Sequence, residues 1–281
     1  MFIDIIYYLC IVGIVMLCLQ IFFFASFKIP SDSMSPALTT GDRVLVYKLI
    51  PGPRLFNLFA TLRVEQVEIY RAPGIRKLRR NDVVVFNYPH FRNWDKIEMH
   101  IMKYFIKRCI GLPGDTLFIR NGFFEIRGVD APLGNMDAQK RISMRDKDSF
   151  EETVYYTFPA DSSLGWDIHD FGPFYIPRKG GEIPMNRTNY LLYKKPIEWE
   201  QKAMLEYRDS IVYLGGKAIE SYAFWKNYYF VAGDRTEDSQ DSRYWGLLPE
   251  EYMVGKAGLV WKSVDPYTGR FRWERFLKTI R

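Results

Sequence analysis

Residues 29–36 read Ile-Pro-Ser-Asp-Ser-Met-Ser-Pro and follow directly on a long apolar segment. Ser33 lies six residues after Phe27, the last residue of that segment, and six extended residues reach at most roughly 20 Å. If the segment crosses a bilayer, Ser33 therefore stays near the membrane face. Prolines on both sides stiffen the chain around it. A serine held in this way is a candidate nucleophile, although such an octapeptide by itself is more often a solvated linker.

The apolar segment Ile5–Phe27 contains no charged residue, and Gln20 is its only strongly polar side chain. Its 23 residues would form a helix of roughly 34 Å, long enough to cross the hydrocarbon core. A cleaved signal peptide is the alternative, but the run is too long and no positive region precedes it. We therefore predict an uncleaved transmembrane anchor over residues 1–27. Asp4 precedes the segment whereas Lys28 and Arg43 follow it, so the charges do not favour a cytoplasmic N-terminus.

The composition excludes several classes of protein. The chain has 281 residues, a formal net charge of +6 and 17% aromatic residues, which fits one span followed by a β-rich soluble part. No basic run stands alone, so nucleic acid is not an expected partner. Cys10, Cys18 and Cys109 form no disulfide framework, and no Cys/His spacing indicates a metal. We expect no metal ion and no cofactor.

Short β-branched and aromatic runs dominate the sequence after the anchor. Asn121-Gly122 separates two of them and predicts a tight hairpin. Residues 50–80 are basic and punctuated by Pro and Gly, and predict a long loop with one helix. The predicted strands are residues 43–48, 82–88, 104–110, 116–120, 123–127, 211–214, 228–232 and 254–264.

The composition changes after Arg127, where charged and Gly/Pro-rich stretches interrupt the β pattern. We predict a mainly β fold. Its parts are the anchor (1–27), a catalytic β core in two parts (28–127 and 227–281) and an inserted smaller, cap-like domain (128–226). One helix is expected within residues 190–208, and the basic tail 270–281 is expected to pack on the sheet. Asp167, His169 and Asp170 resemble metal ligands, but a solvated loop is the better interpretation.

Residues 105–109 place a lysine among apolar neighbours. Alternation along a strand puts Phe105, Lys107 and Cys109 on one face and Ile106 and Arg108 on the other. Partial burial there would lower the pKa of Lys107, and a neutral lysine can act as the general base for a serine. A lysine that protects an edge strand against aggregation is an equally good interpretation.

Residues 233–246 form a polar stretch that reads Gly-Asp-Arg-Thr-Glu-Asp-Ser-Gln-Asp-Ser-Arg-Tyr-Trp-Gly. Loops of this kind are normally surface turns. Here Asp234, Ser239, Asp241 and Arg243 crowd against an aromatic block, which favours a structured loop that orients other groups.

Together, these motifs resemble type I bacterial signal peptidase (leader peptidase, peptidase family S26). The resemblance rests on residues 30–36 followed by Gly41-Asp42, on residues 106–115, and on residues 233–234 and 239–246 in that order behind a membrane span. It covers residues 28–48, 81–127 and 228–264 and leaves most of the insertion unmatched. It implies a signal-peptidase-type β core and a membrane-bound serine endopeptidase.

Residue by residue, the resemblance implies that Ser33 is the nucleophile and Lys107 the general base. The oxyanion hole would be the backbone N–H of Ser33 and the hydroxyl of Ser31. Shallow apolar pockets would accept small side chains before the cleavage site, and Met34 is a candidate lining residue. The implied partners are exported preproteins and membrane lipid, and the implied location is the outer face of the cytoplasmic membrane.

The resemblance also assigns supporting residues. Ser239 would hold the lysine amine, Asp241 and Arg243 would pair behind it, and Asp234 would pair with Arg108. Residues 235–236 are Arg-Thr where the family usually has Asn-Arg, and residue 37 is Ala where Thr is common. The departure at residues 235–236 leaves the role of the outer charges of the loop undecided, but it does not affect the Ser/Lys pair.

Three other classes remain as alternatives. A catalytically silent membrane-anchored paralogue that acts as a binding protein would retain the fold, but Ser33, Lys107 and Ser239 are all present. A self-cleaving Ser/Lys repressor needs a DNA-binding domain where this chain has an apolar segment. A Ser/His/Asp hydrolase is disfavoured by the absence of Gly-x-Ser-x-Gly and by only three histidines.

Overall fold

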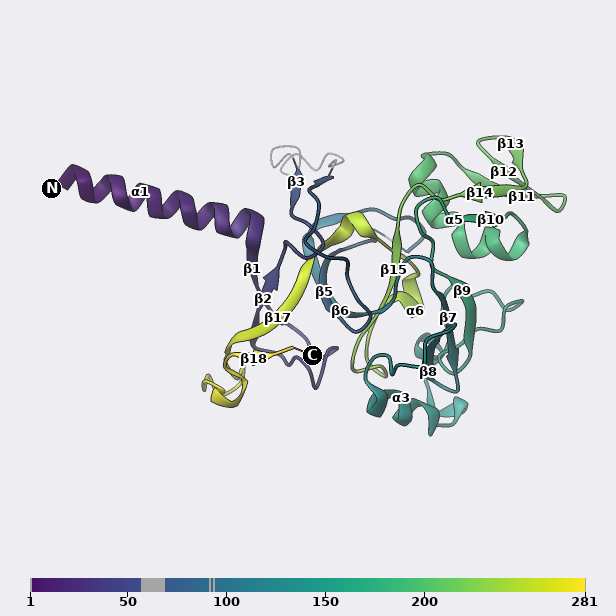
Figure 1. Cartoon of the computed structure of the whole chain (residues 1–281). Coiled ribbons are helices and arrows are strands. Elements are labelled where there is room, and N and C mark those ends of the chain that lie inside the picture. The colour runs from purple at the N-terminus through teal and green to yellow at the C-terminus, as the bar shows by residue number, and fades with distance from the viewer. Residues whose placement is uncertain (1, 57–68, 91, 93, 281) are drawn as a thin grey trace.

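The computed structural model describes residues 2–56, 69–90, 92 and 94–280. One long helix projects from a β-rich body (Figure 1). Residues 57–68, which belong to the loop and helix expected over residues 50–80, lie outside the described residues, and the described part of that range contains no helix. On either side of that gap, β3 (Arg54–Phe56) pairs with β4 (Ile69–Arg71).

The apolar segment forms α1 (Phe2–Cys18) and continues as the π-helical η1 (Leu19–Phe23). A membrane-length helix over Ile3–Phe23 is therefore present, and none of it is buried. The helix ends earlier than expected, because Phe24–Lys28 forms strand β1. Strand β1 pairs with β2 (Asp42–Tyr47) over five residues. The predicted anchor boundary at residue 27 thus lies too far along the chain. Residues 24–28 form a strand instead, because the sheet satisfies their backbone hydrogen-bonding groups.

The main sheet is antiparallel. Its strand order is β1-β2-β17-β5-β6-β15-β16, with β18 paired to β17. Residues 254–264 were expected as a strand and form most of β17, which crosses the middle of this sheet. The members not yet bounded are β5 (Val83–Tyr88), β6 (His100–Gly111), β15 (Tyr228–Ala232), β16 (Leu248–Pro249), β17 (Met253–Ser263) and β18 (Lys278–Thr279).

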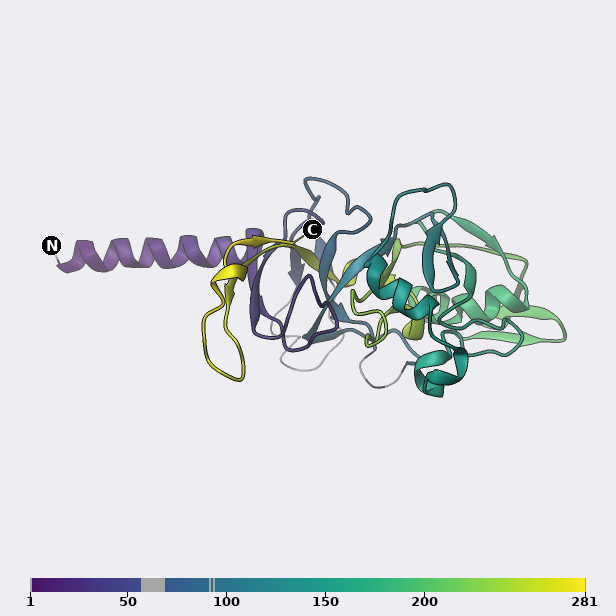
Figure 2. The same ribbon diagram turned by 90° about the horizontal axis from the view of Figure 1, so that it is seen from below.

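A second body lies at the far end of the molecule from the helix (Figures 1 and 2). It contains the three-stranded sheet β8-β7-β9, the sheet β11-β12-β13 and the pair β10-β14. Its strands are β7 (Thr116–Arg120), β8 (Phe123–Ile126), β9 (Phe171–Tyr175), β10 (Glu182–Pro184), β11 (Leu205–Arg208), β12 (Ile211–Leu214), β13 (Lys217–Ile219) and β14 (Ser221–Ala223). Its helices are α3 (Met136–Ser143), η2 (Lys147–Ser149), α4 (Glu152–Tyr155) and α5 (Arg187–Gln201).

The predicted boundary between residues 127 and 128 does not separate two cores. Strand β9 lies in the supposed insertion, yet it pairs with β7, which precedes the boundary. One buried cluster contains Leu117 and Phe124 together with Phe174 and with Phe230 of the main sheet. The insertion therefore completes a core that the hairpin β7–β8 begins.

Several local predictions are confirmed. Asn121 and Gly122 both have positive φ, 48° and 81°, and form the hairpin turn between β7 and β8. Helix α5 (Arg187–Gln201) overlaps the expected range of 190–208 but begins three residues before it. The C-terminal tail packs on the sheet through β18 and through Ile280, which contacts the cluster beneath β2 and β17. Short helices α6 (Ser242–Trp245), η3 (Glu250–Tyr252) and η4 (Trp273–Arg275) complete the chain.

Candidate active site

The candidate nucleophile lies in the loop between β1 and β2. Backbone hydrogen bonds close this loop at its base, where Ile29 N–H donates to Asp42 O at 2.8 Å and Gly41 N–H donates to Ile29 O at 3.1 Å. Met34 and Leu38 are fully buried in the cluster beneath the loop. Ser33 is therefore held between a closed loop base and a buried neighbour, and its hydroxyl has a defined position.

Lys107 meets this hydroxyl from strand β6. Its Nζ lies 2.7 Å from Ser33 Oγ, within hydrogen-bond distance. The strand alternates as expected, because Phe105 and Cys109 pack in one core cluster and Ile106 packs in another. The fold thus brings together two residues that are 74 positions apart in the sequence.

The environment of Lys107 favours its neutral form. Burial lowers the pKa of the amine to about 8, and only 2% of the residue is exposed. The sequence predicted this lowering of the pKa from burial. The Asp241 carboxylate raises the pKa of Lys107, and the Arg243 guanidinium opposes it. Burial prevails because the carboxylate is already paired.

Asp241 and Arg243 form a buried ion pair. Arg243 donates to both Asp241 oxygens, at 2.9 and 2.8 Å, and neither side chain is more than 1% exposed. Asp241 also accepts from Gly233 N–H at 2.9 Å, and Arg243 donates to Thr236 O at 2.8 Å. The pair therefore fixes both ends of the loop 233–243.

The same loop holds the backbone of Ser33. Arg235 N–H donates to Ser33 O at 3.0 Å. A side chain at Gly233 would place its Cβ 2.6 Å from that carbonyl and 2.2 Å from Ser239 Oγ. Glycine is therefore required for this approach. These contacts come from backbone groups, so the sequence carried no signal for them beyond the glycine itself.

Arg108 pairs with Asp234 on the other side of β6. The contact is bidentate, with Nε at 2.6 Å from Oδ1 and Nη2 at 2.5 Å from Oδ2. Arg108 also donates to Asn81 O at 2.8 Å. The side chains of this pair are 7% and 3% exposed, so it lies in the protein interior.

Ser239 and Met34 do not make the contacts that their expected roles require, whereas the Ser31 hydroxyl stays available for its role. Ser239 lies against Gly233, but no described residue, Lys107 included, shares a hydrogen bond with its buried hydroxyl. Met34 is fully buried in the core, so it presents no surface to a substrate in this conformation. Ser31 is exposed. Within the described chain, neither its hydroxyl nor the Ser33 N–H has a hydrogen-bond partner, which leaves both donors free.

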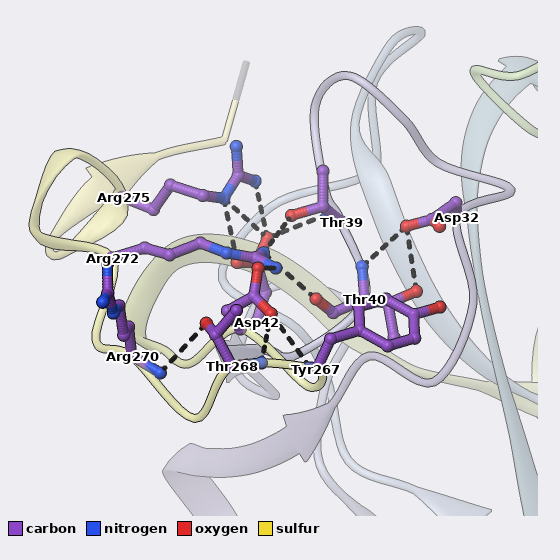
Figure 3. Close-up of polar contacts among 10 residues, drawn as sticks. Asp32, Thr39, Thr40, Asp42, Tyr267, Thr268, Arg270, Arg272 and Arg275 are labelled. Atoms are coloured by element: carbon purple, nitrogen blue, oxygen red, sulfur yellow. Dashed lines mark hydrogen bonds and ion pairs between the residues drawn. The ribbon is translucent and has the colours of Figure 1, made fainter.

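A second network fastens the far side of the nucleophile loop. Arg275 from the C-terminal tail donates to both oxygens of buried Asp42, and its Nη2 lies 2.5 Å from Oδ2 (Figure 3). Although burial raises it, hydrogen bonds from Arg275 and Thr39 bring the pKa of Asp42 below its usual value. Arg272 donates to Thr39 Oγ1 at 3.1 Å. Sequence reasoning missed this network, because the residues that it joins are more than 230 positions apart.

The network borders a shallow depression of about 460 Å³ beside the nucleophile. Asp32 and Ser35, which flank Ser33, line it together with Arg235 and Tyr267. Thr40 holds the Asp32 carboxylate through its N–H at 2.7 Å and its hydroxyl at 2.9 Å. The side chain that precedes the nucleophile is thus fixed.

Asp167 and His169 are neither a metal site nor a solvated loop. Both are buried. Asp167 accepts from the N–H groups of His169 and Asp170, at 2.7 and 2.9 Å, and from the Tyr155 hydroxyl at 2.5 Å. Within the described ranges no cluster of three or more His, Cys, Asp or Glu could hold a metal ion. These residues build a turn.

Known proteins place the chain in a class of peptidases. A model of the family "Signal peptidase, peptidase S26" matches residues 2–262. A signal peptidase I of Buchnera aphidicola subsp. Baizongia pistaciae is 27% identical over 269 residues, which cover 92% of this chain and 76% of that protein. A signal peptidase I of Pseudomonas aeruginosa is 27% identical over 266 residues, with 89% and 68% covered.

A signal peptidase I crystal structure from Enterococcus faecalis V583 is 20% identical and covers 65% of this chain and 98% of that chain. Its TM-score is 0.32, which is too low to compare the two folds. The class that the family match defines is that of peptidases acting on signal peptides. The chain belongs to this family, peptidase S26, and is an enzyme of the signal peptidase I type.

Proposed function

We propose that the chain is a membrane-anchored serine endopeptidase that cleaves exported preproteins through a Ser33–Lys107 dyad and an acyl-enzyme. The observation that carries this proposal is the 2.7 Å contact between Lys107 Nζ and Ser33 Oγ. A neutral amine at this distance can accept the hydroxyl proton as Oγ attacks. With the pKa of Lys107 at about 8, about one lysine in ten is neutral at pH 7.

In the proposed acylation step, Ser33 Oγ bonds to the scissile carbonyl carbon while Lys107 takes its proton. The Ser33 N–H and the Ser31 hydroxyl, both free of other partners, would donate to the oxyanion. Each donor of this kind contributes about 3 kcal/mol in other acyl-transfer sites. The C–N bond then breaks, and the leaving amine takes the proton from Lys107.

In the deacylation step, Lys107 accepts a proton from water, which attacks the ester carbonyl and releases the cut signal peptide. Lys107 then returns the proton to Ser33 Oγ. The proposed substrates have small side chains before the cleavage site. The helix Ile3–Phe23 supports a single anchor. We place this anchor in the cytoplasmic membrane with the β body on its outer side.

The test is cleavage of a model preprotein by the detergent-solubilised full chain. The parent should release the mature protein, and Ser33→Ala should release none. An acylating inhibitor should label the parent at Ser33 and leave Ser33→Ala unlabelled. An active Ser33→Ala variant would refute the dyad, and an inert parent would favour the silent paralogue.

A further inference from the structure

The apolar helix joins the sheet without a linker. η1 ends at Phe23, and Phe24 is already extended, with φ −132° and ψ 152°. Strand β1 then pairs with β2 from Phe24 opposite Tyr47 to Lys28 opposite Arg43. The rings of Phe24 and Tyr47 also lie edge to face at 5.7 Å. The helix therefore cannot swing freely without loosening the first strand of the sheet.

Lys48 closes the end of this helix. The last carbonyls of a helix have no partner within it, and near lipid an unpaired carbonyl is costly. Lys48 follows β2 directly, and its N–H donates to Phe23 O at 2.8 Å. Its Nζ donates to Gln20 O at 2.6 Å and to Ile21 O at 3.2 Å. One residue of the body thus binds three helix carbonyls and places a cation at the negative end of the helix dipole.

Contacts from two further strands hold β1. Trp261 in β17 donates from Nε1 to Ser26 Oγ at 2.9 Å. The ring of Tyr104 in β6 lies 4.9 Å from that of Phe27. Strand β6 also carries Lys107. The base of the helix is therefore fastened to the strands that build the active site.

The nucleophile loop makes this coupling relevant to catalysis. Ser33 lies in the connection from β1 to β2, and these are the two strands that carry the helix and Lys48 (Figure 1). A tilt of the helix relative to the body would change the height of Ser33 above the bilayer. A precursor that is held in the membrane must meet Ser33 at that height, whereas a soluble peptide need not.

We propose that Lys48 is a positioning residue that locks the anchor helix to the catalytic sheet. It thereby holds Ser33 at one height and orientation above the bilayer. This inference rests on the proposed function. It predicts that Lys48 matters for substrates held in the membrane and not for soluble peptides, because only membrane-held substrates must meet the site at a fixed height.

The first measurement tests the coupling between helix and body without relying on enzyme activity. The full-length Cys10→Ser protein is spin-labelled at Cys18 and at a second site made by Tyr267→Cys. In phospholipid vesicles, the distance between the two labels reports the distance from helix to body. Both sites are exposed, whereas Cys109 is buried and burial raises the pKa of its thiol, so it stays unlabelled. We expect a narrow distance distribution, and a broader one after Lys48→Met, which retains the side-chain stem without its donors.

The second measurement compares the cleavage of a soluble substrate with the cleavage of a membrane-held substrate. Lys48→Met should cleave a short soluble peptide in detergent at the parental kcat/KM. Its cleavage of a membrane-embedded precursor in vesicles should fall roughly tenfold, and Lys48→Arg should restore most of the rate. Lys28→Met is the matched control, since it removes an exposed cation of β1 that contacts no helix carbonyl.

A parental distance distribution or parental precursor cleavage in Lys48→Met overturns the proposal, as does an equal loss in Lys28→Met. Loss of soluble-peptide cleavage in Lys48→Met also overturns it, since that points to a damaged fold. If the parent cleaves no precursor, the proposed function fails instead, and the distance measurement still reports the coupling.

Discussion

At the scale of single residues, Lys107 is the group whose protonation decides the proposed chemistry. Burial of its side chain beside Ser33 removes water from the amine, and the paired Asp241 cannot restore the charge. Lowering the pKa of Lys107 from its usual value of 10.5 to about 8 corresponds to about 3 kcal/mol of disfavoured charge. The site therefore holds an unprotonated base at a pH where an exposed lysine is almost fully charged.

The pH dependence of cleavage follows from this pKa. Because the pKa of Lys107 is lowered to about 8, the neutral base is lost as the pH falls through that value. Activity should rise from acid pH and level off above about 8. Lys107→Arg should be inert at every pH, because guanidinium stays protonated. Near-parental cleavage by Lys107→Arg would mean that another group is the base.

Asp234 and Ser239 should behave differently when replaced. Asp234→Ala leaves Arg108 buried without its carboxylate, and loss of one partner of a buried pair costs about 3–5 kcal/mol. Thermal unfolding should therefore show a lower Tm. Ser239→Ala removes a hydroxyl that has no described partner, so Tm should hold. Turnover should still fall if that hydroxyl holds the Lys107 amine during reaction. Parental Tm and turnover in both variants would contradict this account of loop 233–243.

At the scale of elements, the C-terminal tail acts as a brace for the nucleophile loop. Its residues follow β17 and return across the loop base, where Arg272 and Arg275 reach residues 37–42 (Figure 3). These contacts add to the hydrogen bonds within the loop. The shape of the loop therefore also depends on a segment from the other end of the chain.

Replacement of Arg275 tests this brace. Arg275→Met leaves Asp42 fully buried and unpaired, which should cost about 3 kcal/mol and lower cleavage by loosening Ser33. The pKa of Asp42 is lowered in the folded protein, so the contribution is present above about pH 4 and lost on acidification below it. Denaturant unfolding should show the difference from the parent shrinking below pH 4. Arg270→Met, in an exposed residue of the same tail, should change neither quantity.

Strand β1 also sets where the chain can be cut. A truncated protein that begins at Phe24 retains β1 and should fold, whereas one that begins at Lys28 removes it. The second truncation exposes the edge of β2 and removes Ala25 and Phe27 from the core beneath it. We expect a lower Tm and more aggregation for the start at Lys28. Equal Tm values would show that β1 adds nothing to the fold.

At the scale of the whole molecule, β1 and β2, which carry the nucleophile loop, lie at the end of the body nearest the helix, and the second body lies at the opposite end (Figures 1 and 2). This arrangement suits a substrate that emerges from the membrane. It also leaves the second body away from the bilayer, where its shared core supports β6 and β15 from the far side.

The orientation in the membrane is testable on cells. If the body faces outward, protease added to cells without outer membrane or wall should degrade the chain after Pro30 and leave the anchor protected. The flanking charges do not favour this orientation, so the measurement decides whether it is adopted. Full protection of the body would contradict the proposed outward location.

The sequence by itself determined the local features. Strand alternation around Lys107, the turn at Asn121-Gly122 and a membrane-length apolar segment follow from side-chain period and turn chemistry, which act over a few residues. The residues of the Ser/Lys pair were also identified from short motifs. Each of these signals lies within a single stretch of chain.

Tertiary structure decided what depends on distant partners. The end of the helix at Phe23 was set by pairing of β1 with β2, and the boundary at residue 127 failed because β9 pairs with β7. The hydrogen bonds from Arg275 to Asp42 and from Lys48 to the helix carbonyls join distant segments, and no pattern in the sequence indicates that these segments meet. Backbone groups and burial make these contacts, and neither can be read from residue type alone, because each exists only once the chain has folded.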